Sequence, residues 1–136
     1  MIQFKKMLSD AVIPTRAGPN EAGFDLTLVR YVEQVGVNAH MFDTGIAVTP
    51  PAGYYSLVVP HSSIAKHNVY FTNSVGVIDP TYTGSIKVVL SSTYYCAVNL
   101  WDPSVSAAIS THAAGAHWSI GSARVNTNQP GVHRCW

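Results

Sequence analysis

Residues 45–59 read GIAVTPPAGYYSLVV, and this stretch decides the fold class. Residues 45–49 and 54–59 are rich in β-branched and aromatic side chains, which are enriched in strands. Two prolines, an alanine and a glycine lie between them at residues 50–53, and proline with glycine is typical of a tight turn. The stretch therefore predicts a β-hairpin whose strands are residues 45–49 and 54–59.

Short strand-like runs continue along the chain on the C-terminal side of this hairpin. They cover residues 69–72, 75–78 and 85–90, and residues 80–84 (Pro-Thr-Tyr-Thr-Gly) predict a turn between the last two. No long stretch has apolar residues at the period of an amphipathic helix. The sequence therefore predicts an all-β domain: a sandwich, a barrel or a jelly roll.

Size and composition limit the assembly and the partners. A chain of 136 residues has room for one domain with a hydrophobic core. Hydrophobic residues make up 47% and charged residues only 11%, which favours an oligomer that buries part of each subunit's surface. The net charge is +1 and the Lys and Arg residues are scattered, so we expect no nucleic-acid polymer and no membrane as partner.

The N-terminal residues 1–6 (MIQFKK) lack the apolar run and the cleavage site of a signal peptide. No run approaches the ~20 apolar residues that span a bilayer. We therefore expect an intracellular, soluble protein of the cytoplasm or nucleus. Cys96 and Cys135 are then expected to be free thiols, because intracellular thiols stay reduced. The histidines do not have the spacing of a zinc site.

Residues 91–136 differ in composition from the rest of the chain. They hold all three tryptophans and both cysteines, but only three charged side chains and no lysine. Two interpretations stay open: a divergent C-terminal part of the same domain, or a tail translated from a shifted reading frame. We therefore divide the chain into a β core, residues 1–90, and a divergent segment, residues 91–136, which belongs to the same domain if it folds.

Few side chains in the sequence could carry chemistry. Asp79 follows an apolar run and precedes a proline turn, so we expect it at a strand end, either facing a pocket or merely capping the turn. Residues 61–63 (His-Ser-Ser) offer hydroxyl and N–H donors that suit phosphate oxygens, or form a solvated loop. Asp25 and Asp43 are further carboxylates. Neither GxxxxGK[ST] nor GxGxxG occurs, which disfavours the nucleotide folds built on those loops.

Three segments of the sequence resemble the dUTPase family in order and separation. They are AGFDL (22–26), DTGIAVTPPAGYYSLVVPHSSIAK (43–66) and NSVGVIDPTYTG (73–84), and the resemblance covers roughly residues 8–90. It implies a distorted jelly-roll (β-clip) subunit that assembles as a homotrimer with active sites shared between subunits. It also implies a dUTP diphosphatase, which hydrolyses dUTP to dUMP and pyrophosphate, limits uracil in DNA and supplies dUMP.

The resemblance also assigns roles to individual residues. Asp79 would be the general base that deprotonates the water attacking the α-phosphorus. Tyr82 would stack against the deoxyribose and exclude a 2′-hydroxyl. Asn73 and the backbone of a hairpin spanning residues 73–82 would pair with the uracil edge. The implied substrate-binding residues are His61, Ser62, Ser63, Asn73, Gly76, Val77, Ile78 and Tyr82.

A metal ion is implied as cofactor by the same resemblance. Asp25 would help to hold Mg²⁺ through water, since Mg²⁺ keeps most of its waters and uses few carboxylates besides substrate phosphates. The alternative is that Asp25 only braces the turn after Gly23.

The sequence departs from the family pattern in two places. His61 stands where the family has arginine, and histidine is shorter and not permanently charged. Residues 91–136 contain neither the family's Arg-Ile-x-Gln-like strand nor its glycine-rich C-terminal arm. The alternative function is therefore a catalytically impaired, nucleotide-binding or regulatory protein of the same fold. A dCTP deaminase ranks last, because neither Glu21 nor Glu33 supplies the additional glutamate by motif.

Overall fold

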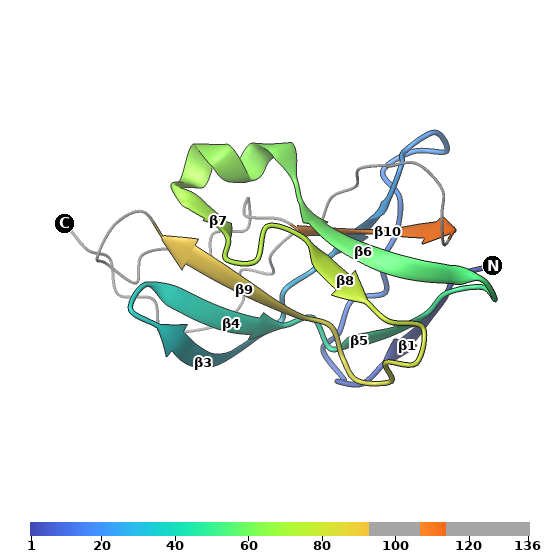
Figure 1. Ribbon diagram of the computed structural model, residues 1–136, viewed down its shortest axis with the longest axis horizontal. Coiled ribbons are helices and arrows are strands. Elements are labelled where there is room, and N and C mark those ends of the chain that lie inside the picture. Colours follow the sequence, from blue (N-terminus) through green and yellow to red (C-terminus); the bar gives the residue numbers. More distant parts are fainter. Residues whose placement is uncertain (93–106, 114–136) are drawn as a thin grey trace.

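The computed structural model describes residues 1–92 and 107–113, and this part of the chain is almost entirely β (Figure 1). The all-β fold class is therefore confirmed. The strands are β1 (Gln3–Lys6), β2 (Phe24–Leu26), β3 (Arg30–Gly36), β4 (Ala39–Asp43), β5 (Ile46–Thr49), β6 (Tyr54–Pro60), β7 (Val69–Phe71), β8 (Gly76–Ile78), β9 (Lys87–Ser92) and β10 (Ala107–Ala113). A short 3-10 helix, η1 (Ser62–His67), follows β6. Among the described residues, no helix has the length and hydrophobicity that crossing a membrane requires.

The strands form three antiparallel sheets. β1 pairs with β5, one four-stranded sheet has the order β2-β10-β6-β8, and the other has the order β3-β4-β9-β7. β10 comes from the compositionally divergent segment and lies between β2 and β6, with residue 108 opposite both Asp25 and Val59. The division of the chain at residue 90 stays a prediction. Cys96 and Cys135 lie outside the described residues, so their expected free thiols stay a prediction too.

The predicted hairpin at residues 45–59 is wrong in its pairing. Both strands form, as β5 and β6, and the turn between them forms as well: Tyr54 N–H donates to the Pro51 carbonyl (3.0 Å), and Gly53 has φ 82°. However, β5 pairs with β1, whereas β6 pairs with β8 and β10. Pro50 and Pro51 have no N–H with which to extend a ladder from the turn, so the chain changes sheets here.

One hydrophobic core joins the three sheets. Each sheet contributes buried side chains to it, for example Val48 from β5, Val58 from β6 and Phe42 from β4. Burial of a side chain of this size contributes about 1.5–3 kcal/mol, so the packing of the sheets against one another fixes their arrangement. The full cluster is Ala11, Leu26, Leu28, Phe42, Ile46, Val48, Val58, Ile64, Val69, Phe71, Ile86, Val88 and Leu90.

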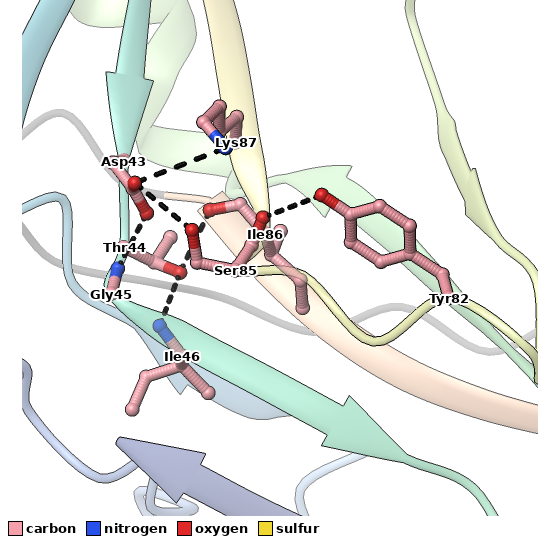
Figure 2. Close-up of polar contacts among 8 residues, drawn as sticks. All are labelled: Asp43, Thr44, Gly45, Ile46, Tyr82, Ser85, Ile86 and Lys87. Atoms are coloured by element: carbon pink, nitrogen blue, oxygen red, sulfur yellow. Dashed lines mark hydrogen bonds and ion pairs between the residues drawn. The ribbon is translucent and has the colours of Figure 1, made fainter. Parts of the chain in front are cut away.

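The crossing from β4 to β5 is a tight turn held by several hydrogen bonds (Figure 2). Gly45 has φ 64°, in the left-handed region that favours glycine. Its N–H donates to Asp43 Oδ1 (2.7 Å). Thr44 Oγ1 accepts from the Ile46 N–H (3.2 Å) and donates to the Ile86 carbonyl (2.9 Å). The Ile86 N–H donates to the Ile46 carbonyl (2.8 Å), so the crossing is fastened to the residue just before β9.

Replacement of Gly45 by alanine should be more destabilising than the same change at Gly53. A β-carbon at this position would lie 2.9 Å from the β-carbons of both Leu8 and Ala11. We expect Gly45→Ala to lower the free energy of unfolding by about 3 kcal/mol, because a left-handed backbone costs about 1–2 kcal/mol and overpacking about 1–3 kcal/mol. Urea denaturation of the full chain measures the change.

Gly53→Ala is the matched control. Gly53 also has a positive φ, but a β-carbon there meets no atom within 4 Å. Its expected loss is the backbone strain alone, about 1 kcal/mol. Equal losses in the two variants would contradict the close packing of Gly45.

Candidate active site

A tight turn places Asp79 and Tyr82 at a fixed spacing. Asp79 directly follows β8 and is exposed, as is Tyr82, whose relative exposure is 42%. The Tyr82 N–H donates to the Asp79 carbonyl (3.0 Å), which closes a four-residue turn with Pro80 in its second position. Proline favours that position because its φ is already fixed near the turn value. A carboxylate and an aromatic ring therefore stand at opposite ends of one rigid turn.

β8 is an edge strand within the described part of the chain. It pairs with β6 on one side, with Gly76 opposite Val58 and Ile78 opposite Ser56. It is the last strand in the order β2-β10-β6-β8. The expected hairpin over residues 73–82 is therefore wrong, because β8 pairs with β6 and not within that segment. An edge strand has backbone N–H and C=O groups available for a further partner.

The turn that leads into β8 is strained. Ser74 has φ 62°, and the Val75 N–H donates to the Asn73 carbonyl (2.6 Å), two residues back. A three-residue turn with positive φ at its central residue is rare for a residue other than glycine. The side-chain Nδ2 of Asn73 lies beside Gly76, 3.8 Å from where a β-carbon would be. The Asn73 amide and the start of β8 thus lie next to each other.

His61 and Ser62 lie where β6 gives way to η1. His61 is half-buried and Ser62 is exposed, while the side chain of Ser63 lies outside the described part. The Ile64 N–H donates to the His61 carbonyl (3.0 Å), which begins the 3-10 helix. The sequence allowed either a phosphate-binding segment or a solvated loop at residues 61–63. The structure shows that this segment begins a short helix, and phosphate binding stays a prediction.

The predicted site residues are spread along β6: Asp79 and His61 lie at opposite ends of the strand, and Gly76 lies between them, opposite Val58. Asp79 directly follows Ile78, which is opposite Ser56 near the start of β6, whereas His61 directly follows the end of that strand. At ~3.3 Å per residue, the two ends are roughly 15–20 Å apart. Asp25 lies near the His61 end, because residue 108 of β10 is opposite both Asp25 and Val59. One chain therefore does not bring Asp25 and His61 together with Asp79.

Asp25 is a half-buried carboxylate at the centre of β2. Its N–H donates to the Thr15 carbonyl (2.8 Å). Among the described residues, no group of three His, Cys, Asp or Glu side chains could hold a metal ion. A single carboxylate fits Mg²⁺ bound mainly by waters and substrate phosphates, and does not fit a metal cage built by the protein alone.

Two residues near Tyr82 could not be identified from the sequence as important. Ser85 receives the Tyr82 hydroxyl hydrogen bond on its carbonyl, and its own hydroxyl donates to Asp43. Gly84 lies directly beneath the Tyr82 ring. The only signal for these two residues in the sequence is their closeness to Tyr82. That closeness does not reveal the contact of Ser85 with Asp43, which lies forty-two positions earlier.

Comparison with known proteins gives a consistent family match. Residues 9–101 match the dUTPase family. A deoxyuridine 5'-triphosphate nucleotidohydrolase of Helicobacter hepaticus is 40% identical over 90 residues, which cover 65% of this chain and 57% of the relative. The chain spans between 54% and 60% of the length of three bacterial relatives of this name.

Solved structures show the same fold. A mutant dUTPase of Staphylococcus bacteriophage 80alpha with dUpNHpp superposes with a TM-score of 0.60 at 23% identity, covering 69% of this chain and 55% of that one. A mutant dUTPase of phage phi11 of S. aureus, described with a structural Mg(II) ion, gives a TM-score of 0.62 at 19% identity, covering 100% of this chain and 92% of that one. At these identities the likeness concerns the fold alone.

The strain at Ser74 predicts an unusual stabilising substitution. Ser74→Gly should raise the free energy of unfolding by about 0.5–1 kcal/mol, because the strain it removes, about 1–2 kcal/mol, exceeds the added chain entropy of glycine. Ser74→Ala keeps the strained backbone, and the side chain is exposed, so this control should leave stability unchanged within about 0.5 kcal/mol. The same stability for both variants in urea denaturation would contradict a strained turn.

Proposed function

The chain belongs to the dUTPase family, and on that basis we propose that it is a dUTP diphosphatase, which hydrolyses dUTP to dUMP and pyrophosphate. The reaction limits uracil in DNA and supplies dUMP. The observation that carries the proposal is the turn from Asp79 to Tyr82 at the end of an edge strand, because it joins a water-activating carboxylate to a sugar-binding ring beside open backbone groups. The phage 80alpha relative that binds dUpNHpp supports the same substrate.

Uracil recognition is assigned to the segment from Asn73 to Ile78. Along β8 (Gly76–Ile78), alternate residues direct their backbone N–H and C=O groups away from β6 and toward the polar edge of the base, and the Asn73 amide lies beside Gly76. A site that pairs polar groups with one base discriminates strongly, since a wrong base leaves those groups unpaired. The strained turn at Ser74 supports this assignment, because strained backbone is concentrated at ligand-binding sites.

Catalysis is assigned to Asp79. Its carboxylate takes a proton from a water molecule, the water oxygen bonds to the α-phosphorus, and the bond from that phosphorus to the bridging oxygen breaks, which releases pyrophosphate. Tyr82 lies against the deoxyribose and leaves no room for a 2′-hydroxyl. Positioning and charge neutralisation supply most of the rate in such phosphoryl chemistry, so no protein nucleophile is needed.

Binding of the phosphates and the metal ion is assigned to the residues near the C-terminal end of β6 and in β2. Ser62, the backbone of Ser63, and His61 contact phosphate oxygens. Asp25 would hold Mg²⁺ through water, and the ion would supply charge neutralisation for the triphosphate. The phage phi11 relative, which coordinates a structural Mg(II) ion, supports a metal-binding fold.

A homotrimer with shared sites is supported by the separation of Asp79 from Asp25 and His61. Asp25 and His61 lie at one end of β6 and Asp79 at the other, roughly 15–20 Å away along the strand. In a closed, rotationally symmetric oligomer, the phosphate-binding residues of one subunit can lie next to the base-binding segment of the neighbouring subunit. The low charge content of the chain agrees with such an assembly.

The second candidate is a nucleotide-binding or regulatory protein of this fold without turnover. His61 favours it, because arginine binds phosphate bidentately and histidine does not. Residues 91–136 also lack the family's C-terminal motifs. Tight dUTP binding without product would support this candidate.

Asp79→Asn should abolish turnover while leaving nucleotide binding intact. The amide cannot accept the proton of water, so we expect pyrophosphate release from dUTP to fall by at least about 100-fold. Asp10→Asn, at an exposed aspartate remote from the site residues in sequence, is the matched control and should retain the wild-type rate. Pyrophosphate release with Mg²⁺ measures both. An Asp79→Asn variant as active as wild type would refute the assignment.

His61→Arg should strengthen the phosphate site. A permanently charged, bidentate side chain should improve kcat/KM for dUTP by about tenfold. The gain should shrink at high salt, because the added interaction is between charges. Lys66→Arg, which keeps a charge on the exposed side of η1, is the control and should change little. Equal activity of wild type and His61→Arg at neutral pH would contradict the role of this position.

A further inference from the structure

The orientation of the Tyr82 ring depends on few contacts. The ring belongs to an exposed turn, with a relative exposure of 42%. Its hydroxyl donates a hydrogen bond to the Ser85 carbonyl (2.9 Å). Packing in the core therefore does not determine where the ring points, and this hydrogen bond fixes its far end.

Gly84 allows the ring to take this position. A β-carbon on Gly84 would lie 2.6 Å from the Tyr82 hydroxyl oxygen and 2.8 Å from Cζ. Both distances are too short for any side chain. The ring thus folds back over the chain between Tyr82 and Ser85, and the direction of its face depends on where Ser85 is held.

Ser85 is held by a residue from a distant part of the sequence. Its hydroxyl donates to Asp43 Oδ2 (2.9 Å), forty-two residues earlier in the chain. The Asp43 side chain is only 11% exposed, and a hydrogen bond to a carboxylate in such surroundings is stronger than one between neutral groups. Figure 2 shows Asp43, Ser85 and Tyr82 joined in one row by these contacts.

Asp43 is itself held by contacts with residues other than Ser85. Its Oδ1 accepts the Gly45 N–H (2.7 Å), and its carbonyl accepts the Val29 N–H (2.9 Å). Lys87 Nζ approaches Oδ2 only to 4.0 Å and its side chain is 39% exposed, so this ion pair contributes little. The carboxylate therefore connects the rigid crossing between β4 and β5 to the turn that bears Tyr82.

We propose that Asp43 is a positioning residue that, through Ser85, sets the orientation of the Tyr82 ring and thereby the discrimination between deoxyribose and ribose. This inference rests on the proposed role of Tyr82 at the sugar. Asp43 does not touch the nucleotide. If its contact with Ser85 is lost, the ring moves away from its position and a 2′-hydroxyl is tolerated, so selectivity falls more than binding of the deoxynucleotide.

The test compares the affinities of the wild-type chain and its variants for the α,β-imido analogues of dUTP and UTP, by isothermal titration calorimetry with Mg²⁺. Ser85→Ala removes the hydroxyl and leaves the Asp43–Gly45 contact in place. We expect the affinity ratio of the deoxy to the ribo analogue to fall by about tenfold, the loss of one hydrogen bond to a charged group. Asp43→Asn should reduce it less, because the amide can still donate to the Ser85 hydroxyl.

Two further variants separate positioning from a general loss of structure. Ser85→Thr retains the hydroxyl and should restore the wild-type ratio. Lys87→Gln removes the weak ion pair on the same carboxylate and should leave the ratio unchanged. A ratio unaffected by Ser85→Ala, or lowered equally by Lys87→Gln, would overturn the proposal.

A measurement without nucleotide distinguishes failure of this inference from failure of the proposed function. Tyrosine labelled with ¹³C at Cζ reports the hydroxyl hydrogen bond by NMR, and Tyr82→Phe assigns the signal. The Tyr82 signal should shift in Ser85→Ala and return in Ser85→Thr. An unmoved signal would overturn the link between Asp43 and Tyr82. A moved signal in a chain that binds both analogues equally would uphold the link and refute the sugar-binding role of Tyr82.

Discussion

A left-handed glycine held by the aspartate two residues before it determines how the sheets meet. Gly45 turns the chain out of β4 and into β5, which belongs to a different sheet, and only a residue without a β-carbon fits beside Leu8 and Ala11. Asp43 satisfies the Gly45 N–H at this crossing, and Thr44 joins it to the backbone of Ile86. Ala11 belongs to the core to which all three sheets contribute and Leu8 packs against that core, so the crossing at Gly45 lies directly against it.

The same crossing reaches the functional region through the residues just before β9. Ser85 and Ile86 are both bound to the Asp43–Thr44 pair, and Tyr82 is bound in turn to Ser85. The Tyr82 ring is therefore attached to the scaffold. His61 lies at the other end of β6 from Asp79, and we propose that residues of neighbouring subunits complete the site.

Local sequence patterns predicted the strands and the turn chemistry well, and long-range pairing poorly. The strands flanking residues 50–53 formed, yet they joined different sheets, because strand-like composition does not specify the partner strand. The hairpin expected over residues 73–82 was wrong for the same reason. The family motifs singled out Asp79 and Tyr82, whose roles stay predictions. The contact between Asp43 and Ser85 spans forty-two residues and depends on the crossing at Gly45, which has no local signal. The composition of residues 91–136 gave no indication that a strand from this segment pairs with β2 and β6.

We propose that this fold selects uracil and deoxyribose together and cleaves the triphosphate. The test is pyrophosphate release by the purified wild-type chain with Mg²⁺, measured in parallel with dUTP, dTTP, dCTP and UTP. Release from dUTP, with at least about 100-fold less from each of the other three, is the predicted result, since each mismatched group either clashes or leaves buried polar groups unpaired. Equal release from all four nucleotides, or none from dUTP by a correctly folded oligomer, would contradict it.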